Sequence, residues 1–363
     1  MPTEPGRESS AVVRPQPMGT ATYTASSRLQ AAGLFTAMEL FEQAARVVPL
    51  PPAPQPIAIA DYGSADGYNS LLPIGAAITT VRRRTRPDHA ILVAHTDRPG
   101  NDFTALFTTI AEDPDSYLHK DRATFPSAVG RSFYQQILPS ASIALGWSAW
   151  ATHWLSRVPA PIDDHIHIAH STNQETRRAY AHQAAVDWHD FLAFRGREIA
   201  PGGRLVVLTL TLDRSGHAGF EGVVDALLEG LEQQVDSGLV RPEERRQMVI
   251  PTVGRTEGDF MAPFAPSGRF EGLSVERLEM FEAPDRFWAR YQVDGNAAAF
   301  GAAWAGFARA VIFPALVAAV STEDGRRAAV IDQLEAQVAS RLSAQPCPNV
   351  IPLAALVAVK VPR

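Results

Sequence analysis

Two polar turns in the first third of the chain carry residue types that suit a nucleotide-like ligand. The first spans 61–69 and contains two glycines, and the second spans 95–103. Glycine lets the backbone approach a ligand without a Cβ atom in the way. Asp97, in the second turn, would be able to hydrogen-bond both hydroxyls of a ribose. A nicotinamide enzyme and a methyltransferase would each suit this pattern, and an acidic turn residue is often only a helix N-cap.

The spacing of the glycines argues against a pyrophosphate ligand. Ser64, Ala65 and Asp66 separate Gly63 from Gly67, so the turn is not the G-x-G-x-x-G sequence of dinucleotide-binding folds. A lysine-containing phosphate-binding motif is absent from the sequence as well.

An aromatic cluster follows later in the chain. It comprises 131–139 and 147–159, and three of the six tryptophans fall between positions 147 and 154. Such a cluster could be a patch of the hydrophobic core. It could also form a pocket in which indole N–H groups and an imidazole donate hydrogen bonds to an anionic ligand. The residues alone leave both interpretations open.

Short apolar strands that alternate with helices are expected to position these residues. Strands are predicted at 57–60, 90–94, 123–126, 143–145 and 204–212, and helices at 26–47, 71–78 and 177–194. This alternation predicts an α/β fold with a mostly parallel, doubly wound sheet. Ligands of such sheets bind at the carboxyl ends of the strands, where both polar turns begin.

The second half of the chain is mainly helical and is expected to cap that edge of the sheet. Helices are predicted at 222–234, 242–248, 296–320 and 324–342, with strands at 273–281 and 350–361. The expected divisions are a disordered tail (1–17), an N-terminal active-site segment and helix (18–48), a ligand-binding α/β domain (49–215), a mainly helical cap with one returning strand (216–330), and a C-terminal helix with an edge strand (331–363).

The composition argues against several classes of partner. A net charge of −6 argues against a nucleic-acid-binding surface, and the one dense basic run, 82–86, reads as a solvated loop. Cys347 is the only cysteine, which excludes an intramolecular disulfide and a multi-cysteine metal site and suits the cytoplasm. Every apolar stretch is shorter than the roughly 18 to 20 residues of a membrane helix. Residues 1–17 lack the apolar centre of a signal peptide.

The turns and the aromatic cluster resemble motifs of the SABATH family, the carboxyl methyltransferases of salicylate and benzoate and their N-methylating relatives in theobromine synthesis. Five motifs are echoed in the family's order, at 22–30, 61–69, 96–104, 131–139 and 148–159. The family turn D-L-G-C-S-S-G-P-N, for example, keeps its aspartate, both glycines and its asparagine at 61–69. The resemblance covers about residues 18–215 well and the rest loosely. It implies a class I methyltransferase (Rossmann-like) sheet with an α-helical cap.

The resemblance implies that S-adenosylmethionine (SAM) is the cofactor and S-adenosylhomocysteine (SAH) the product. The implied cofactor-binding residues are Tyr23, Asp61, Gly63, Ser64, Asn69, Asp97, Arg98, Ser132 and Phe133. Tyr23 and the first turn would surround the methionine part and the sulfonium. Asp97 would hold the ribose hydroxyls, with Arg98 beside the adenine. Ser132 and Phe133 would complete the adenosine pocket.

The same resemblance implies a binding site for the methyl acceptor. Gln30 and Trp154 would act in catalysis by donating hydrogen bonds to a carboxylate, and Tyr23, Trp150 and His153 would shape the pocket. A carboxylate is ionised at neutral pH, so this reaction needs no general base. We expect an in-line displacement at the sulfonium methyl that depends on proximity and orientation.

The sequence departs from the family pattern at three places. Arg98 replaces the usual leucine, and Trp150 stands where the family has tyrosine, which would reshape the pocket. Some plant members carry a magnesium-site pattern, D-x-F-N-x-P, and the stretch 246–251 has lost those ligands. We therefore expect no metal.

The acceptor is expected to be a small hydrophobic acid. The alanine-rich composition and the simplified cap indicate a bacterial member, and some bacterial relatives esterify free fatty acids. An apolar roof of Phe260, Met261, Phe264, Trp304, Phe307 and Phe313 would suit a medium-chain fatty acid, with an aromatic acid nearly as suitable. The alternatives are an N-methyltransferase of a small heterocycle, a nicotinamide-dependent oxidoreductase, and an inactive cofactor-binding protein. Family members are often homodimers.

Overall fold

The computed structural model describes residues 32–320 and 325–362. Its centre is a seven-stranded sheet in the order β3-β2-β1-β4-β5-β7-β6. The strands are β1 (Ile57–Tyr62), β2 (Ile91–Asp97), β3 (Thr124–Gly130), β4 (Ile143–Ala149), β5 (Ile199–Leu210), β6 (Leu273–Ala283) and β7 (Ile351–Lys360). Strands β1 to β5 run parallel, and β7 is antiparallel to both of its neighbours. This is the predicted doubly wound α/β sheet.

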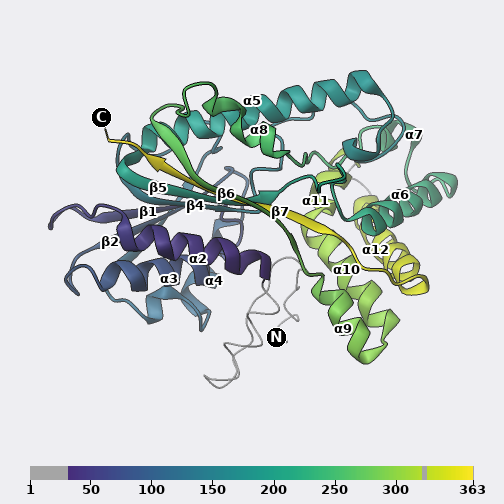
Figure 1. The fold of residues 1–363 in the computed structure, drawn as a ribbon. Coiled ribbons are helices and arrows are strands. Elements are labelled where there is room, and N and C mark those ends of the chain that lie inside the picture. The colour runs from purple at the N-terminus through teal and green to yellow at the C-terminus, as the bar shows by residue number, and fades with distance from the viewer. Residues whose placement is uncertain (1–31, 321–324, 363) are drawn as a thin grey trace.

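Helices cover both faces of the sheet, so its central strands are apolar on both sides. Helices α2 (Ala32–Val47), α3 (Leu71–Arg82) and α4 (Phe103–Glu112) lie on one side, and the long helix α5 (Gln174–Glu198) lies on the other (Figure 1). In β1, Ile57, Ile59 and Ala60 are fully buried, as expected for a strand packed between two layers. Asn173 begins α5 by accepting hydrogen bonds from the first free backbone N–H groups.

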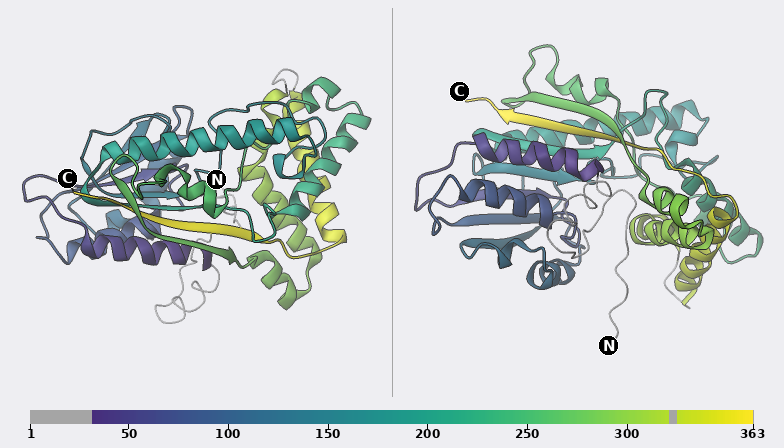
Figure 2. Two further views of the ribbon diagram at one scale, coloured as in Figure 1. Left: turned by 45° about the horizontal axis from the view of Figure 1, so that its top comes forward. Right: turned by 60° about the horizontal axis from the view of Figure 1, so that its bottom comes forward.

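The remaining helices, apart from α8, form the cap at one end of the sheet, to the right in Figure 1 and again together in both views of Figure 2. Its longer helices are α6 (Glu221–Asp236), α9 (Arg286–Asp294), α10 (Ala297–Val311) and α12 (Arg326–Ala344), and the short α7 (Pro242–Arg245) and α11 (Phe313–Leu316) belong to it as well. The short α8 (Glu257–Met261) lies beside α5 instead, where Phe260 packs against Trp188. Strand β7 leaves the cap after α12 and runs antiparallel to β5. The carboxyl ends of the parallel strands therefore point toward the cap.

The chain order changes direction between β1 and β4. From β1 the chain builds outward to β2 and β3, then returns to β4 on the other side of β1. At such a switch point the loops after the two strands diverge and leave a crevice at their carboxyl ends, where ligands of this fold class bind. The turn after β1 and the aromatic segment after β4 both begin there.

Two predictions about the C-terminal half are wrong. Residues 296–320 do not form one helix, because the chain bends by 54° between α10 and α11. Pro314 explains the bend, since proline has no N–H to continue the ladder of helical hydrogen bonds. The last strand is not an edge strand, because β7 lies between β5 and β6.

The burial of the two strands explains their order. Residues 351–358 of β7 are all buried, as suits a central strand, whereas β6 exposes Glu276 and Glu282 and forms the edge. The expected boundary between 330 and 331 falls inside helix α12. Within the described ranges, no single helix is long and apolar enough to cross a membrane; α10 and the bent segment after it pass that test of length and composition only as a pair.

Candidate active site

The two polar turns lie against each other at the carboxyl ends of β1 and β2. The backbone N–H groups of Gly63 and Ser64 both donate to the carbonyl oxygen of Thr96, at 2.9 and 3.0 Å. The N–H of Ala65 donates to Oδ2 of Asp97 at 2.8 Å. In return, the side-chain amide of Asn101 donates to the carbonyl oxygen of Ala65 at 2.8 Å. These bonds make one continuous surface of the turns 61–69 and 95–103.

Gly63 is the point at which three of the predicted segments meet. Its φ of +89° lies in the left-handed region that favours glycine. A Cβ atom here would lie 2.5 Å from Cβ of Ala151 and 3.4 Å from the ring of Phe133. The first turn, the 131–139 segment and the aromatic segment after β4 therefore pack directly on one another.

Two residues of the first turn are more deeply buried than a ligand contact requires. Asp61 is 1% exposed, and its Oδ2 lies 2.8 Å from Nδ1 of His95, whose Nε2 lies 2.9 Å from the hydroxyl of Tyr117. Ser64 is also buried, and its hydroxyl donates to the carbonyl oxygen of Thr96 at 3.4 Å. The structure thus gives both side chains partners within the protein, and Asp61 connects β1 to β2.

Asp97 and Arg98 face outward from the same turn. The Asp97 carboxylate is partly exposed, and Oδ1 accepts the N–H of Arg98 at 2.7 Å while Oδ2 accepts the N–H of Ala65. Two backbone donors thus hold one carboxylate in a defined orientation at the end of β2. The Arg98 side chain is exposed. This arrangement leaves both residues accessible to a ligand in the crevice.

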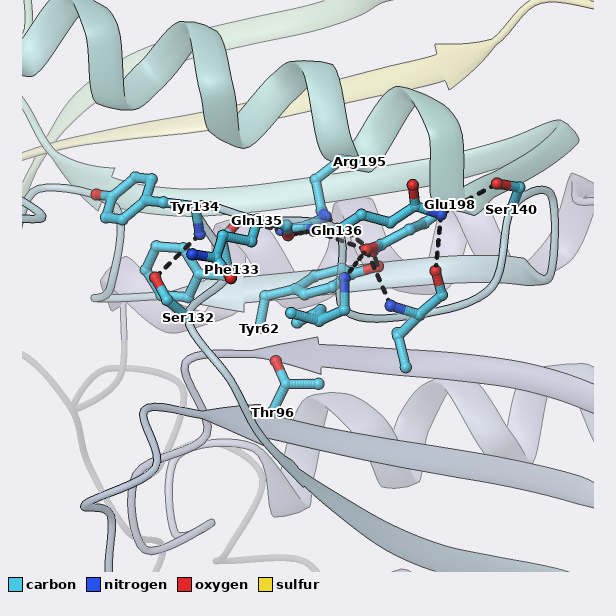
Figure 3. Close-up of polar contacts among 12 residues, drawn as sticks. Tyr62, Thr96, Ser132, Phe133, Tyr134, Gln135, Gln136, Ser140, Arg195 and Glu198 are labelled. Atoms are coloured by element: carbon cyan, nitrogen blue, oxygen red, sulfur yellow. Dashed lines mark hydrogen bonds and ion pairs between the residues drawn. The ribbon is translucent and has the colours of Figure 1, made fainter.

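The segment 131–139 is held in place by a buried ion pair from α5 (Figure 3). The Arg195 guanidinium donates to the carbonyl oxygens of Phe133 and Gln135, at 2.7 and 3.0 Å. The Glu198 carboxylate accepts the N–H groups of Ile137 and Leu138 and the hydroxyl of Tyr62, at 2.7, 3.0 and 2.9 Å. A loop without regular structure is therefore clamped on two sides.

The clamp positions the two residues of this segment that the family resemblance implicates in cofactor binding. Ser132 and Phe133 are both partly buried, and the Ser132 hydroxyl accepts the N–H of Tyr134 at 3.3 Å. The Phe133 ring packs edge-on against Tyr134 and Phe191, with centroids 4.7 and 5.5 Å away. The ring thus rests on Tyr134 and Phe191, and its Cε1 atom borders Gly63.

An apolar pocket lies on the other side of the first turn, between the sheet and the cap. It encloses about 880 Å³ of empty space, part of it open to solvent. Asn69, the last residue of the first turn, and the three aromatic residues Trp150, His153 and Trp154 form part of its wall. The remaining lining residues are His167, Leu210, Ala218, Gly219, Phe220, Val224, Ile250, Thr252, Gly254, Phe307, Val311 and Ile312. Trp150 and Trp154 therefore share a pocket wall with the first polar turn. Trp147, the third tryptophan of the cluster, is fully buried in the core and packs against Phe41 of α2, so the core interpretation holds for it.

The aromatic wall offers neutral polar groups. The indole Nε1 of Trp150 is buried and has no hydrogen-bond partner among the residues that the structure describes. His153 is 4% exposed, and burial, together with the nearby Arg255 and His167, lowers its pKa to about 3, so its imidazole is neutral at physiological pH. Trp154 is held through its carbonyl oxygen, which accepts the hydroxyl of Tyr134 at 2.6 Å.

Two of the predicted site residues, Tyr23 and Gln30, lie outside the described residues.

The predicted apolar roof is largely wrong: of its six members, only Phe307 lines the pocket. Phe260 and Phe264 are buried in the layer that contains Trp188, on the α5 side of the sheet. Sequence periodicity could not show which of these aromatic residues face the pocket, because residues of one helix or loop pack against different layers.

Several positioning residues were missed by sequence reasoning. Asn101, His95 and the Arg195–Glu198 pair hold the two turns and the 131–139 segment, yet none was singled out. The Arg195–Glu198 pair could have been found in the sequence. Its opposite charges are three residues apart on the helical face that carries Trp188 and Phe191, and this pattern indicates a buried ion pair. No sequence pattern could have revealed the pocket residues Phe220, Val224 and Val311, because only the packing of the cap on the sheet brings them together.

Comparisons with known proteins agree with this geometry. A family model described as SAM dependent carboxyl methyltransferase matches residues 11–358. The chain is 32% identical over 243 residues to Methyltransferase FUS9 of Gibberella fujikuroi, which covers 66% of this chain and 64% of that protein. It is 29% identical over 252 residues to the salicylate carboxymethyltransferase of Clarkia breweri, which covers 66% of this chain and 67% of that protein. The match to FUS9 thus spans slightly less than two thirds of that relative.

A solved structure shares the fold over the full length. It is a loganic acid methyltransferase with SAH, 20% identical, covering 100% of this chain and 99% of that chain with a TM-score of 0.71. The family model, which matches most of the chain, carries the assignment, and the shared fold agrees with it. The chain belongs to the family of SAM-dependent carboxyl methyltransferases, whose methyl donor is S-adenosylmethionine.

Proposed function

We propose that this protein transfers the methyl group of SAM to the carboxylate of a small hydrophobic acid and releases a methyl ester. The observation that carries the proposal is the position of Asn69, which belongs to the polar turn after β1 and also lines the apolar pocket. A ligand in the crevice and a ligand in the pocket would therefore meet at one boundary. Family membership argues against a nicotinamide-dependent oxidoreductase.

The donor and acceptor groups of the crevice suit SAM. Asp97, oriented by two backbone N–H groups, would accept hydrogen bonds from both ribose hydroxyls. Phe133, clamped by Arg195, would pack against the adenosine, and Asn69 would lie near the methionine part. Asp61 would support the cofactor site mainly by holding His95, because its Oδ2 already lies at hydrogen-bond distance from the His95 ring. When bound, SAM supplies an electrophilic methyl group on a sulfonium.

The chemistry requires orientation of the acceptor, and no proton has to be removed. A carboxylate with a reference pKa near 4 is ionised at neutral pH and is itself the nucleophile. The Trp154 indole would donate a hydrogen bond to one carboxylate oxygen, together with Gln30. Nε1 of Trp150, which has no hydrogen-bond partner among the described residues, supplies a further neutral donor. Neutral donors orient the carboxylate without the strong charge pairing that an arginine would impose, so its oxygen stays nucleophilic.

A medium-chain fatty acid is the favoured substrate, and an aromatic acid is the alternative. Besides the aromatic side chains, the pocket is lined by Leu210, Val224, Val311 and Ile312, which suit an alkyl chain. Two polar residues of the pocket, His167 and Thr252, lie 3.0 Å apart through Nε2 and Oγ1 and can bond each other. A ring substituent that needs a hydrogen-bond partner would compete with that contact.

A substrate panel with SAM carrying a labelled methyl group tests the proposal. The panel contains a chain-length series of saturated fatty acids, benzoate, salicylate and a xanthine. We expect labelled product from the fatty acids, with a maximum at medium chain length, and label release by mild alkali, because esters hydrolyse under conditions that leave N-methyl groups intact. Alkali-stable label on the xanthine would favour the N-methyltransferase alternative. Binding of SAH without transfer to any acid would contradict carboxyl methylation.

A further inference from the structure

Three histidines cluster between positions 165 and 170, ahead of α5, and the proposed methyl transfer uses none of them. They divide into two groups. His167 is buried, lines the apolar pocket and lies 3.0 Å from Oγ1 of Thr252. His165 and His170 lie together, with their rings stacked at a centroid distance of 4.7 Å and an interplanar angle of 25°.

Asp225 of helix α6 approaches this second group from the cap. One nitrogen of His165, one nitrogen of His170 and one carboxylate oxygen of Asp225 all lie within 4.8 Å of one another. Ligand atoms around a tetrahedral zinc ion, at about 2.0–2.1 Å from the metal, lie about 3.3 Å apart. The three atoms would have to approach by at most about 1.5 Å, which is within reach of side-chain rotation because the Asp225 side chain is exposed.

The Nε2 atom of His170, which belongs to this cluster, is without a partner in the part of the chain that the structure describes. It is buried and forms no hydrogen bond with any residue of the described ranges. A buried polar atom without a partner costs free energy, and such atoms are rare unless an ion or a water occupies the site. Arg245 is the nearby cation, but its Nε lies 2.8 Å from Oε1 of Glu232, so its charge is compensated.

We propose that His165, His170 and Asp225 form a binding site for a divalent transition-metal ion, with zinc as the best match. Two imidazole nitrogens and one carboxylate oxygen are ligands that zinc takes at tetrahedral sites, with water in the fourth position. Magnesium instead prefers an octahedral shell of oxygen atoms. This site is separate from the stretch 246–251, on which the expectation of no metal was based.

The ion would connect two elements that form the wall of the apolar pocket. His167 of the histidine segment and Val224, which directly precedes Asp225, both line that pocket. Metal bound only by the folded chain adds its binding free energy to folding stability. The role of the site is therefore to tie the segment 165–170 to the cap and to hold the pocket wall, apart from the methyl-transfer chemistry.

Metal binding is tested on the full-length, untagged protein after a chelator has removed bound metal. Zinc affinity and stoichiometry are measured by calorimetry, and Co²⁺ serves as a probe because tetrahedral Co²⁺ absorbs visible light strongly. The variants are His170→Ala and Asp225→Asn. The matched control is His217→Ala, which removes an exposed histidine 3.4 Å from Asp213, outside the histidine cluster.

We expect one equivalent of zinc to bind to the wild type and to His217→Ala, with the tetrahedral Co²⁺ spectrum and a raised Tm. Each cluster variant should bind zinc at least about tenfold more weakly and lose the rise in Tm. SAH binding verifies the fold of His170→Ala, and Asp225→Asn, an isosteric change at an exposed position, decides the question if His170→Ala does not fold. Unchanged zinc affinity in Asp225→Asn, no zinc binding by the wild type, or an equal effect of Mg²⁺ would overturn the proposal.

Discussion

Arg195 and Glu198 form an ion pair one helical turn apart on α5, and neither side chain has any exposed surface. Arg195 Nε and Nη2 lie 3.0 and 2.9 Å from the two carboxylate oxygens, and the guanidinium lies 4.3 Å from the centre of the Tyr62 ring. The other side-chain hydrogen bonds of the pair within the described residues run to the 131–139 segment and to Tyr62 of β1. The pair thus connects α5, the sheet and one wall of the crevice.

Replacing Glu198 with Gln should destabilise the fold and loosen the crevice. The change leaves the Arg195 charge buried without its partner, so the free energy of unfolding should fall by about 3–5 kcal/mol. SAH affinity should fall as well, because Phe133 loses its support. Urea unfolding and calorimetry measure the two effects. The control is Glu276→Gln at the exposed Arg204–Glu276 pair, which should cost less than about 1 kcal/mol; equal losses in both variants would contradict the clamp.

Replacing Gly63 with Ala should damage the site more than its backbone conformation alone explains. Gly216 provides the control, because its φ of +84° is similar to the +89° of Gly63 but a Cβ atom there has nothing within 4 Å. Gly216→Ala should cost about 1 kcal/mol of stability from strain. Gly63→Ala should cost more and weaken SAH binding, and adding Ala151→Gly should recover part of the loss. A double variant no better than Gly63→Ala would refute the contact.

Replacing Asp97 with Asn should weaken SAH binding, because the amide nitrogen can accept neither a ribose hydroxyl nor one of the two backbone N–H groups that Asp97 holds. A hydrogen bond to a charged group contributes about 1.5–3 kcal/mol, so calorimetry should show a loss of roughly tenfold to a hundredfold in affinity. The control is Asp88→Asn, which changes an exposed carboxylate in the surface pair Arg86–Asp88. It should leave the SAH affinity unchanged. Similar affinities in both variants would rule out ribose recognition by Asp97.

Replacing Trp154 with Phe should slow methyl transfer without affecting the cofactor. The ring volume is largely kept and the indole donor is lost, so kcat/KM for the acid should fall by about tenfold or more while the Kd for SAH stays constant. Trp288→Phe, on α9 among Tyr291 and Phe300, is the matched control. A weaker SAH complex with normal turnover at saturation would show that Trp154 serves the cofactor instead.

His153 should make the fold less stable in mild acid. Its folded-state pKa is lowered to about 3, whereas the unfolded chain binds this proton near pH 6.5. The unfolded state is therefore favoured as the pH falls below 6.5, and between pH 7 and 5 this group removes about 2 kcal/mol of stability. Urea unfolding of His153→Gln should show a smaller loss over that interval than the wild type or the exposed-site control His189→Gln. Parallel curves for all three proteins would exclude His153 as the cause.

Much of the sheet could be predicted from the sequence because its signals are local. Strand β1 is a short apolar run that ends at a glycine turn, and β2, which ends at Asp97, repeats the pattern. In both cases a few consecutive residues determine where a buried strand stops and where the chain can turn. The family motifs at 61–69 and 131–139 are equally local, so they could be located from the sequence without coordinates.

The order of the last two strands and the shape of the cap required the structure. Nothing within 350–361 specifies that it enters the sheet beside β5, 140 or more residues earlier in the chain. Pro314 was visible in the sequence, but the alanine-rich residues around it favoured one continuous helix. Whether Phe307 or Phe260 lines the pocket depends on which layer each helix packs against, which no local pattern encodes.

The sequence by itself determined the fold class, the family and the residues available for chemistry, because spacing along a strand or a turn is a property of neighbouring residues. Only the tertiary structure decided that Gly63 packs on Ala151, that the Arg195–Glu198 pair supports the crevice, and that the pocket is built from α6 and α10. These contacts join residues far apart in the chain. They arise when the cap and the helices bury their apolar faces on the sheet, and that packing is decided by the whole molecule at once.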